Sequence, residues 1–276
     1  MPDLRTDIQD VLAQFRLDGR VALLTGATGH LGRPMARALA AAGAHVVLNA
    51  RQKDALDSLA RELTSAGKKV STACFDITDD GAAKTHIAQL AETHGRLDVI
   101  VNNAHSGSPG TIASATTKDF QQAYWVSVTA AFQLIQFALP LLKESAKRLP
   151  GGAAVINIAS MYGSVSPDPS IYGTSGANNP PYYGPAKAAL IQLTRYTACH
   201  LATDRIRVNC ISPGPFPASQ FLKNDPAFAD RLCAKVPMRR LGDGNELQGP
   251  LLFLASDASS FVTGANLAVD GGWTAW

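Results

Sequence analysis

A tyrosine and a lysine four positions apart, Tyr183 and Lys187, could carry acid–base chemistry. On a helix, residues at i and i+4 share one face. A nearby ammonium favours the phenolate, so the pair predicts a Tyr183 pKa below the ordinary value of about 10 and a proton donor or acceptor near neutral pH. Pro185 fits a helix only in its first turn, which predicts a helix from residue 182 to 201. Alone, this spacing is a weak signal, because such pairs are usually surface residues.

A glycine-rich turn follows the first apolar run of the chain. Gly26, Gly29 and Gly32 lie between a predicted strand at 21–25 and an alanine-rich predicted helix. Glycine lets backbone N–H groups approach a pyrophosphate, and the helix N-terminus behind the turn favours negative charge. The strand–turn–helix context predicts a dinucleotide site, and the alternative is an ordinary loop.

The residues after the second predicted strand bear on the choice of cofactor. Dinucleotide folds usually place an acid here to hold the ribose hydroxyls, but the first carboxylate after this strand is Asp54, already in the next helix. Arg51 can pair with a 2′-phosphate, which favours NADP and leaves NAD possible. Alternatively, Arg51 is a solvated loop charge. Asp76 ends the third predicted strand, where it could accept from the adenine amino group or cap the following helix.

Strands and helices alternate along the chain. Apolar runs predict strands at 21–25, 45–48, 69–75, 99–101, 154–158, 207–211 and 267–269, and periodicity predicts helices at 32–42, 53–65, 79–94, 117–142, 182–201 and 247–255, with a further helical piece near the middle of 213–237. This alternation predicts one α/β domain over residues 20–276: a doubly wound Rossmann domain with a mostly parallel sheet of six to seven strands. An N-terminal helical extension is expected over residues 1–19, where apolar residues recur at helical spacing at Leu4, Ile8, Val11, Leu12 and Phe15.

Several short motifs come in a definite order. They are the glycine turn, Asn102-Asn103-Ala104, Ser160, the Tyr183/Lys187 pair, Arg207-Val208-Asn209, Ser212-Pro213-Gly214 and Val269-Asp270-Gly271-Gly272. In this order they resemble the short-chain dehydrogenase/reductase family over residues 18–276. The resemblance implies a single Rossmann domain, usually a homotetramer, that transfers hydride between NAD(P) and a carbonyl or alcohol.

The resemblance also implies roles for individual residues. Tyr183 would be the acid/base, Ser160 would hydrogen-bond the substrate oxygen, and Lys187 would bind the nicotinamide ribose and tune Tyr183. The expected cofactor-binding residues are Gly26, Thr28, His30, Leu31, Gly32, Arg51, Asp76, Asn103, Ala104, Tyr183, Lys187, Pro213 and Gly214.

Three positions depart from the family pattern. Ser127 stands where the family has a fourth catalytic residue, an asparagine, and we place it among the expected catalytic residues. His105 replaces the glycine after Asn-Asn-Ala and could project toward the substrate cleft, although a lone histidine is more often structural. Ala218 replaces a threonine, so a contact to the cofactor amide is lost or moved.

The interval between Ser160 and Tyr183 is longer than the family norm. Its polar stretch, residues 164–179, predicts a substrate wall suited to a polyol or sugar acid, with a solvent-exposed loop as the alternative. This stretch and the ending Gly-Gly-Trp-Thr-Ala-Trp resemble the gluconate-5-dehydrogenase-like branch, which implies a sugar-acid or sugar-derived substrate.

The composition excludes several classes of protein. Apolar residues make up 46% and charged residues 17%, which excludes a disordered chain, and a net charge of +3 does not indicate a nucleic-acid partner. No unbroken run of about 18 apolar residues predicts a membrane span. Acids near the N-terminus do not fit a signal peptide, and the scattered cysteines fit reduced thiols, so we expect a cytoplasmic protein. The six histidines show no metal-binding spacing.

The expected function is therefore an NAD(P)-dependent oxidoreductase, with NADP favoured, acting on a carbonyl or secondary alcohol of a polyol-like or sugar-acid molecule. One alternative is a cofactor-binding protein without redox turnover, which the three departures motivate. Others are a 3-oxoacyl reductase-like enzyme, or a lyase, epimerase or dehydratase on the same fold. The apolar helices predicted at 117–142 and 182–201 could pair across a two-fold axis, which predicts a homotetramer or homodimer.

Overall fold

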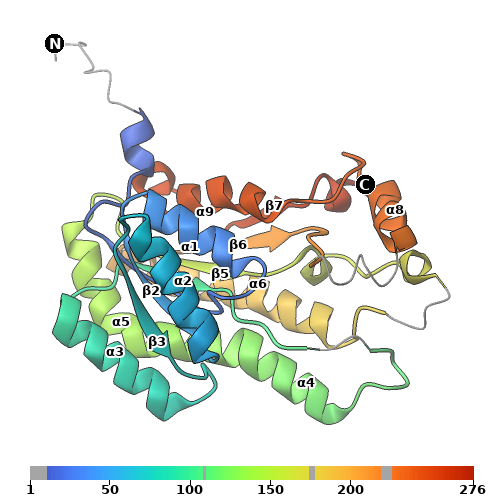
Figure 1. Cartoon of the computed structure of the whole chain (residues 1–276), viewed down its shortest axis with the longest axis horizontal. Helices are drawn as coiled ribbons and strands as arrows, with labels where there is room; N and C mark the ends of the chain where they lie inside the picture. The colour runs from blue at the N-terminus through green and yellow to red at the C-terminus, as the bar shows by residue number, and fades with distance from the viewer. Residues whose placement is uncertain (1–10, 108–109, 174–177, 219–225) are drawn as a thin grey trace.

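The computed structural model describes residues 11–107, 110–173, 178–218 and 226–276 (Figure 1). Its strands are β1 Val21–Leu24, β2 His45–Ala50, β3 Val70–Cys74, β4 Val99–Asn102, β5 Ala153–Ile158, β6 Ile206–Pro213 and β7 Asn266–Val269. Its α-helices are α1 Gly32–Ala41, α2 Lys53–Ser65, α3 Asp80–His94, α4 Thr117–Tyr124, α5 Ala130–Arg148, α6 Tyr183–Leu201, α8 Pro226–Lys235 and α9 Gln248–Ala255. The predicted α/β fold is confirmed.

The strands form one seven-stranded sheet in the order β3-β2-β1-β4-β5-β6-β7, and every neighbouring pair is parallel. β1 pairs with β2 on one side and with β4 on the other, so the direction of winding reverses between β1 and β4. In open α/β sheets, ligands bind outside the carboxyl ends of the strands at such a reversal. This topology therefore places any site at the ends of β1 and β4.

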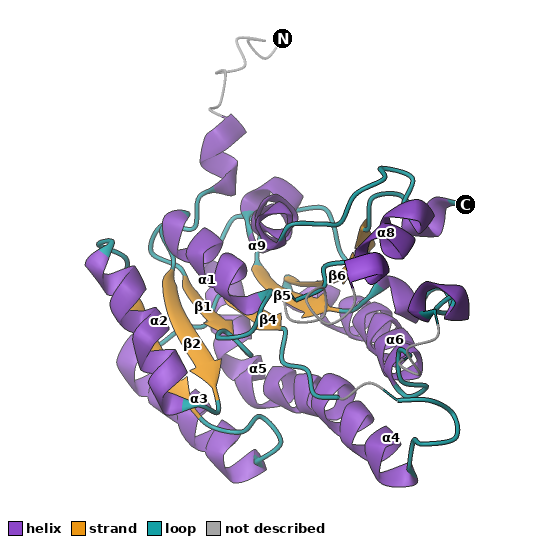
Figure 2. Cartoon of the chain, turned by 45° about the vertical axis from the view of Figure 1, so that its right-hand side comes forward, coloured by secondary structure: helices purple, strands orange, loops and turns teal. Residues whose placement is uncertain are grey.

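Apolar residues that alternate along the strands supply two cores, one on each face of the sheet. Ala22 and Leu24 of β1 pack with α1, α2 and α9, whereas Val21 and Leu23 pack with α3 and α5. Figures 1 and 2 show α1 and α9 on one side of the sheet and α5 on the other. Because both faces are covered, the strands read as continuous apolar runs in the sequence.

The helix predicted over 117–142 is longer and is interrupted. A π-helical turn at Trp125–Thr129 separates α4 from α5, which continues to Arg148. By length and composition alone, Thr117–Arg148 could cross a membrane. A core helix meets the same criteria, and this segment places Leu134, Ala138 and Leu142 in the core beside the sheet. We therefore interpret it as a core helix.

The observed bounds of three other elements can be compared with those predicted from the sequence. α6 begins at Tyr183, so Pro185 lies in its first turn, as predicted. The helical piece expected within 213–237 is α8 at Pro226–Lys235, and residues 219–225 before it lie outside the described residues. In the described part of the N-terminal extension, Val11–Phe15 form a 3₁₀ helix, whereas Leu4 and Ile8 lie outside the described residues. Leu17 is fully buried and joins the main core.

Candidate active site

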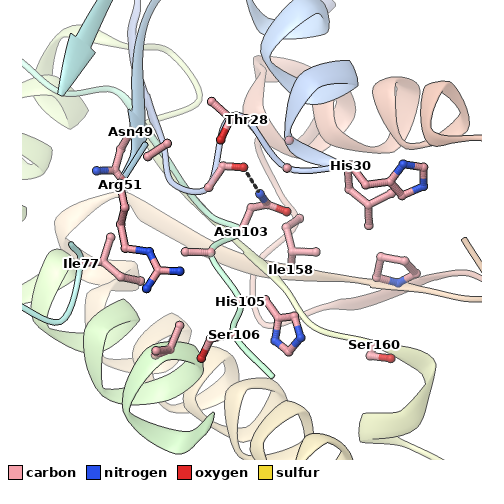
Figure 3. Close-up of a pocket in the computed structure, with 18 of the residues that line it drawn as sticks. Thr28, His30, Asn49, Arg51, Ile77, Asn103, His105, Ser106, Ile158 and Ser160 are labelled. Atoms are coloured by element: carbon pink, nitrogen blue, oxygen red, sulfur yellow. Dashed lines mark hydrogen bonds between the residues drawn. The ribbon is translucent and has the colours of Figure 1, made fainter. Parts of the chain in front are cut away.

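A cavity of about 500 Å³ lies where the carboxyl ends of the strands meet. Ser160 and all thirteen residues expected to bind the cofactor line it: Gly26, Thr28, His30, Leu31, Gly32, Arg51, Asp76, Asn103, Ala104, Tyr183, Lys187, Pro213 and Gly214. Figure 3 shows Arg51 toward one side of this view and Ser160 toward the other, with Asn103 and His105 between them. The structure thus brings residues from β1 to α6 together at one place.

Two positions of the glycine-rich turn leave no room for a side chain. Gly26 has a φ of +61°, and a Cβ there would lie 3.0 Å from the Ala104 Cα. A Cβ at Gly32 would lie 2.2 Å from the Gly26 carbonyl oxygen. Leu31, which precedes α1, provides no side-chain cap, and the N-terminus of a helix favours negative charge. This arrangement fits a pyrophosphate.

The end of β4 is tied to this turn by hydrogen bonds. Asn103 Nδ2 donates to the carbonyl oxygens of Thr25 and Gly26, at 3.0 and 3.1 Å. The buried Thr25 hydroxyl accepts from the backbone N–H groups of Asn103 and Ala104, at 2.9 and 3.0 Å. Asn103 therefore shapes the cavity through the turn, and Thr25 is a positioning residue that the sequence reasoning missed.

The end of β2 presents a cation to the cavity. Arg51 is exposed, and its guanidinium lies 3.5 Å from the Asp76 carboxylate in a loose ion pair. Asp76 accepts from Thr78 N–H and hydroxyl, which lowers its pKa despite some burial. Helix α3 is capped instead by Asp79, so capping is not the role of Asp76. Asn49 donates to the carbonyl oxygens of Ala73 and Phe75, so its amide braces the neighbouring strand.

The ammonium of Lys187 is buried at the centre of the site. It is 3% exposed, and its Nζ donates to the Ile158 carbonyl oxygen at 2.7 Å. The same atom lies 5.7 Å from the centroid of the Tyr183 ring. Removal from water disfavours the charged form and lowers the pKa of Lys187 to about 8.

Ser160 and Tyr183 form the polar end of the cavity. Ser160 is buried, and its Oγ accepts from the Tyr162 N–H at 3.2 Å. Burial raises the pKa of Tyr183, and a hydrogen bond with Ser160 offsets part of that rise. The expectation of a lowered pKa is therefore wrong for the chain by itself, because desolvation of the phenol outweighs the hydrogen bond with Ser160. At neutral pH the phenol carries its proton.

A buried chain of amides and hydroxyls positions α6 against the sheet. Asn102 Nδ2 donates to Asn157 Oδ1 at 2.8 Å, and Asn157 Nδ2 donates to the Thr194 hydroxyl at 2.9 Å. The Thr194 hydroxyl donates in turn to the Leu190 carbonyl at 2.8 Å. These bonds join β4, β5 and α6, the three elements that carry Asn103, Ser160 and Tyr183.

The three departures from the expected pattern have different positions. His105 lines the cavity, and its ring meets the Tyr183 ring edge-on with centroids 5.1 Å apart. Ser127 is buried in the π-helical turn and is not among the lining residues, whereas its neighbour Val126 is. The turn packs against α6. Ala218 is also absent from the described lining.

The polar loop expected to wall the substrate site pairs with protein instead. Among residues 164–173 and 178–179, none lines the cavity. Asp168 pairs with Lys235 of α8 at 2.6 Å, and the Arg231 Nε donates to the Ile171 carbonyl at 2.6 Å. Tyr172 hydrogen-bonds with Tyr162. Residues 174–177 lie outside the described residues.

Comparison with known proteins assigns the chain to a family. Residues 26–274 match the family model described as enoyl-(acyl carrier protein) reductase. The chain belongs to the short-chain dehydrogenase/reductase family. It is therefore a member of an oxidoreductase family.

Individual members of this family match over nearly the whole chain. An uncharacterized oxidoreductase of Mycobacterium tuberculosis is 37% identical over 96% of this chain and 95% of its own length. The rhamnolipids biosynthesis 3-oxoacyl-(acyl-carrier-protein) reductase of Pseudomonas aeruginosa is 34% identical over 94% of this chain and 98% of its own. The structure of a gluconate 5-dehydrogenase from Burkholderia cenocepacia, with NADP and tartrate, is 32% identical at a TM-score of 0.85, covering 96% of this chain and 99% of that one.

Further residues line the cavity that the sequence reasoning did not name as site residues. They are Gly29, Asn49, Ala50, Gln52, Phe75, Ile77, His105, Ser106, Val126, Ile158, Ala159 and Phe216, of which His105 had been considered only as a departure. Most of them follow strands β2 to β6, so their position at strand ends was the signal that could have found them. Val126 had no such signal, because it depends on the π-helical turn.

The depressed pKa of Lys187 predicts a pH-dependent stability. The folded chain releases this proton near pH 8, whereas the unfolded chain keeps it to about pH 10.4. Between these values the unfolded state binds more protons, so the contribution of Lys187 to the free energy of unfolding rises with pH. Relative to Lys187→Met, the wild type should gain about 1–3 kcal/mol between pH 7 and pH 10, measured by urea unfolding without nucleotide.

Lys147→Met serves as the control, because this lysine is largely exposed on α5. Its difference from the wild type should not change over the same pH range. A pH-independent difference for Lys187→Met would show that its ammonium is not desolvated.

Proposed function

We propose that this chain is an NADP-dependent oxidoreductase that interconverts a carbonyl and a secondary alcohol, with Tyr183 as its acid/base. The observation that carries the proposal is the meeting of Ser160, Tyr183 and Lys187 at one end of a cavity that also contains the glycine turn. A protein that only binds the cofactor would have no use for a protonated phenol beside a buried ammonium, which favours turnover over the non-redox alternative.

The chain's own residues account for the proton chemistry. When bound, NADPH supplies the hydride, and binding, orientation and protonation are left to the protein. Ser160 Oγ donates a hydrogen bond to the carbonyl oxygen of the substrate and holds that oxygen beside the Tyr183 hydroxyl. Ser160 and Tyr183 already hydrogen-bond with each other in the structure. Tyr183, kept protonated by its raised pKa, donates its proton to that oxygen as it becomes an alkoxide. The Lys187 ammonium stabilises the negative charge that forms on the phenolate. Only one of its N–H groups donates to Ile158, so others are left to donate to ribose hydroxyls.

The assignment of NADP rests on the electrostatics at the end of β2. Arg51 lines the cavity with only a loose ion pair, and no acid follows β2 to repel a 2′-phosphate. The gluconate 5-dehydrogenase structure that this chain resembles contains NADP. The other residues proposed to hold the cofactor are Gly26, Thr28, His30, Leu31, Gly32, Asp76, Asn103, Ala104, Pro213 and Gly214.

Ser127 enters the proposal as a positioning residue. It is buried in the turn that brings Val126 to the cavity wall. The serine side chain is shorter than the asparagine usual in the family at this position.

Two substrate classes fit the family members named above. A polyol or sugar acid is favoured by the gluconate 5-dehydrogenase crystallised with tartrate. A 3-oxoacyl substrate is the second candidate, favoured by the 3-oxoacyl reductase and by an apolar cluster beside Ser160 that includes Tyr162, Trp273 and Phe228. Rates of NADPH oxidation with 5-ketogluconate and with acetoacetyl-CoA separate the two classes.

The proposed enzyme is a cytoplasmic homo-oligomer, a tetramer or a dimer. All four cysteines are free thiols, which suits a reducing compartment. Aromatic side chains are exposed on adjacent elements, with Trp125 in the π-helical turn and Phe132 on α5 each 42% exposed and Tyr196 on α6 57% exposed. Such an apolar surface suits pairing of identical faces across a two-fold axis.

Tyr183→Phe removes the proton donor while keeping the ring. Turnover should fall by about 10²–10⁴-fold. The dissociation constant for NADPH, measured by fluorescence titration, should stay near that of the wild type. Tyr196→Phe, on the outer face of the same helix, should retain full activity. Equal turnover in Tyr183→Phe would contradict the assignment.

Arg51→Ala removes the cation offered to the 2′-phosphate. The dissociation constant for NADPH should rise about 10- to 100-fold, as expected for loss of a charge-assisted hydrogen bond, and that for NADH should hardly change. Lys53→Ala is the matched control, because this neighbouring lysine already pairs with Asp57. A wild-type preference for NADH would refute the NADP assignment.

Trp125→Glu combined with Phe132→Glu places two charges on the exposed aromatic surface. Light scattering should show the wild type as a dimer or tetramer and the variant as a smaller species with an unchanged circular dichroism spectrum. Arg61→Glu, exposed on α2, should leave the mass unchanged. A monomeric wild type would overturn the proposed assembly.

A further inference from the structure

His105 follows β4 and lies at the polar end of the cavity. Its imidazole is exposed along the cavity and contacts the Tyr183 ring edge-on, with centroids 5.1 Å apart. Tyr183 in turn hydrogen-bonds with Ser160. These contacts place an imidazole next to the two residues that bind the reacting oxygen. In the view of Figure 3 its ring lies between Ser106 and Ser160.

The nitrogens of this imidazole are available to a ligand. No hydrogen bond joins them to any described residue, whereas His45 bonds with Ser71 at 3.0 Å and His200 with the Tyr196 carbonyl at 2.8 Å. Surrounding protein atoms and the charge of Lys187 lower the pKa of His105 below its ordinary value. At neutral pH the ring is therefore uncharged and offers one donor and one acceptor.

The described residues of the loop after Ser160 offer the cavity little polar recognition, because their polar groups bond to other parts of the protein. Asp168 pairs with Lys235, and the Tyr162 and Tyr172 hydroxyls bond with each other. Tyr162 also packs edge-on against Trp273, with ring centroids 6.2 Å apart. His105 lines the cavity beside Tyr183 and this loop does not, so His105 is better placed than the loop to distinguish a plain ketone from an oxygenated one.

We propose that His105 is a specificity-determining residue whose imidazole binds a hydroxyl on the carbon next to the reacting carbonyl carbon. Because the His105 and Tyr183 rings are in contact, a group held by the imidazole must lie close to the carbonyl oxygen held by Tyr183. A hydroxyl both donates and accepts, which matches a neutral imidazole. The substrate class is then an α-hydroxyketone or the corresponding vicinal diol. This inference rests on the proposed reductase function.

The experiment compares cyclohexanone with 2-hydroxycyclohexanone, using the full chain and NADPH. The wild type should favour the hydroxyketone in kcat/KM. His105→Phe, which keeps an aromatic ring without nitrogens, should lower kcat/KM for the hydroxyketone about 10- to 100-fold and leave that for cyclohexanone within about twofold. His105→Asn, which restores a donor and an acceptor, should recover part of the loss.

His200→Phe is the control, because this exposed histidine of α6 bonds to its own helix. Equal losses with both ketones in His105→Phe, or no loss with either, would overturn the proposal. So would a wild type that does not favour the hydroxyketone. If the wild type oxidises NADPH with neither these ketones nor the carbonyl compounds named above, the reductase function itself fails. A changed NADPH dissociation constant in His105→Phe would instead place His105 in the cofactor site and count against the proposal.

Discussion

The site depends on a buried ammonium held at the end of a strand. Lys187 Nζ donates to the carbonyl oxygen of Ile158, the last residue of β5, and so fixes α6 relative to the sheet. Ser160 follows Ile158 in sequence, and Tyr183 precedes Lys187 by one helical turn. Together with the Asn102–Asn157–Thr194 chain, this short hydrogen bond sets how the serine and the tyrosine face each other. Burying this charge costs free energy, and the lowered pKa of Lys187 reflects that cost.

Other motif residues stabilise the frame around that bond. Arg207 is buried in β6, and its guanidinium donates to the carbonyl oxygens of Gly151, Leu254 and Ser256. Asn209 donates to Val262 and accepts from Ala265, which fixes the chain that enters β7. A sequence motif can therefore identify a family although residues of that motif only hold loops in place and do not contact a ligand.

The sequence predicts the fold well because its signals are local and repeated. The five inner strands are largely buried apolar runs, whereas the edge strands β3 and β7 are only partly buried. Gly26 and Gly32 stand where close contacts leave no room for a Cβ. The lining of the cavity by Ser160, Tyr183 and Lys187 also follows from sequence, because each comes at the end of a strand or the start of a helix. Their assigned roles remain predictions, and the Tyr183→Phe and Arg51→Ala variants test two of them.

What could not be predicted depends on distant parts of the chain. The direction of the Tyr183 pKa shift is set by how closely the protein surrounds the phenol, which spacing does not reveal. The polar residues of 164–173 suggested a ligand, but their partners lie on α8, far along the sequence. Burial of Ser127 follows from the π-helical turn, and periodicity alone does not show such a turn.

That π-helical turn also limits how the chain can vary in length. A π-turn closes i→i+5 hydrogen bonds, so it holds one residue more than an α-helical turn, and loss of one residue within Trp125–Thr129 would leave a regular α-helical turn. The backbone that brings Val126 to the cavity wall would change with it. Insertions and deletions should therefore be rare in this segment among related chains, and commoner in the surface loop after Ser164.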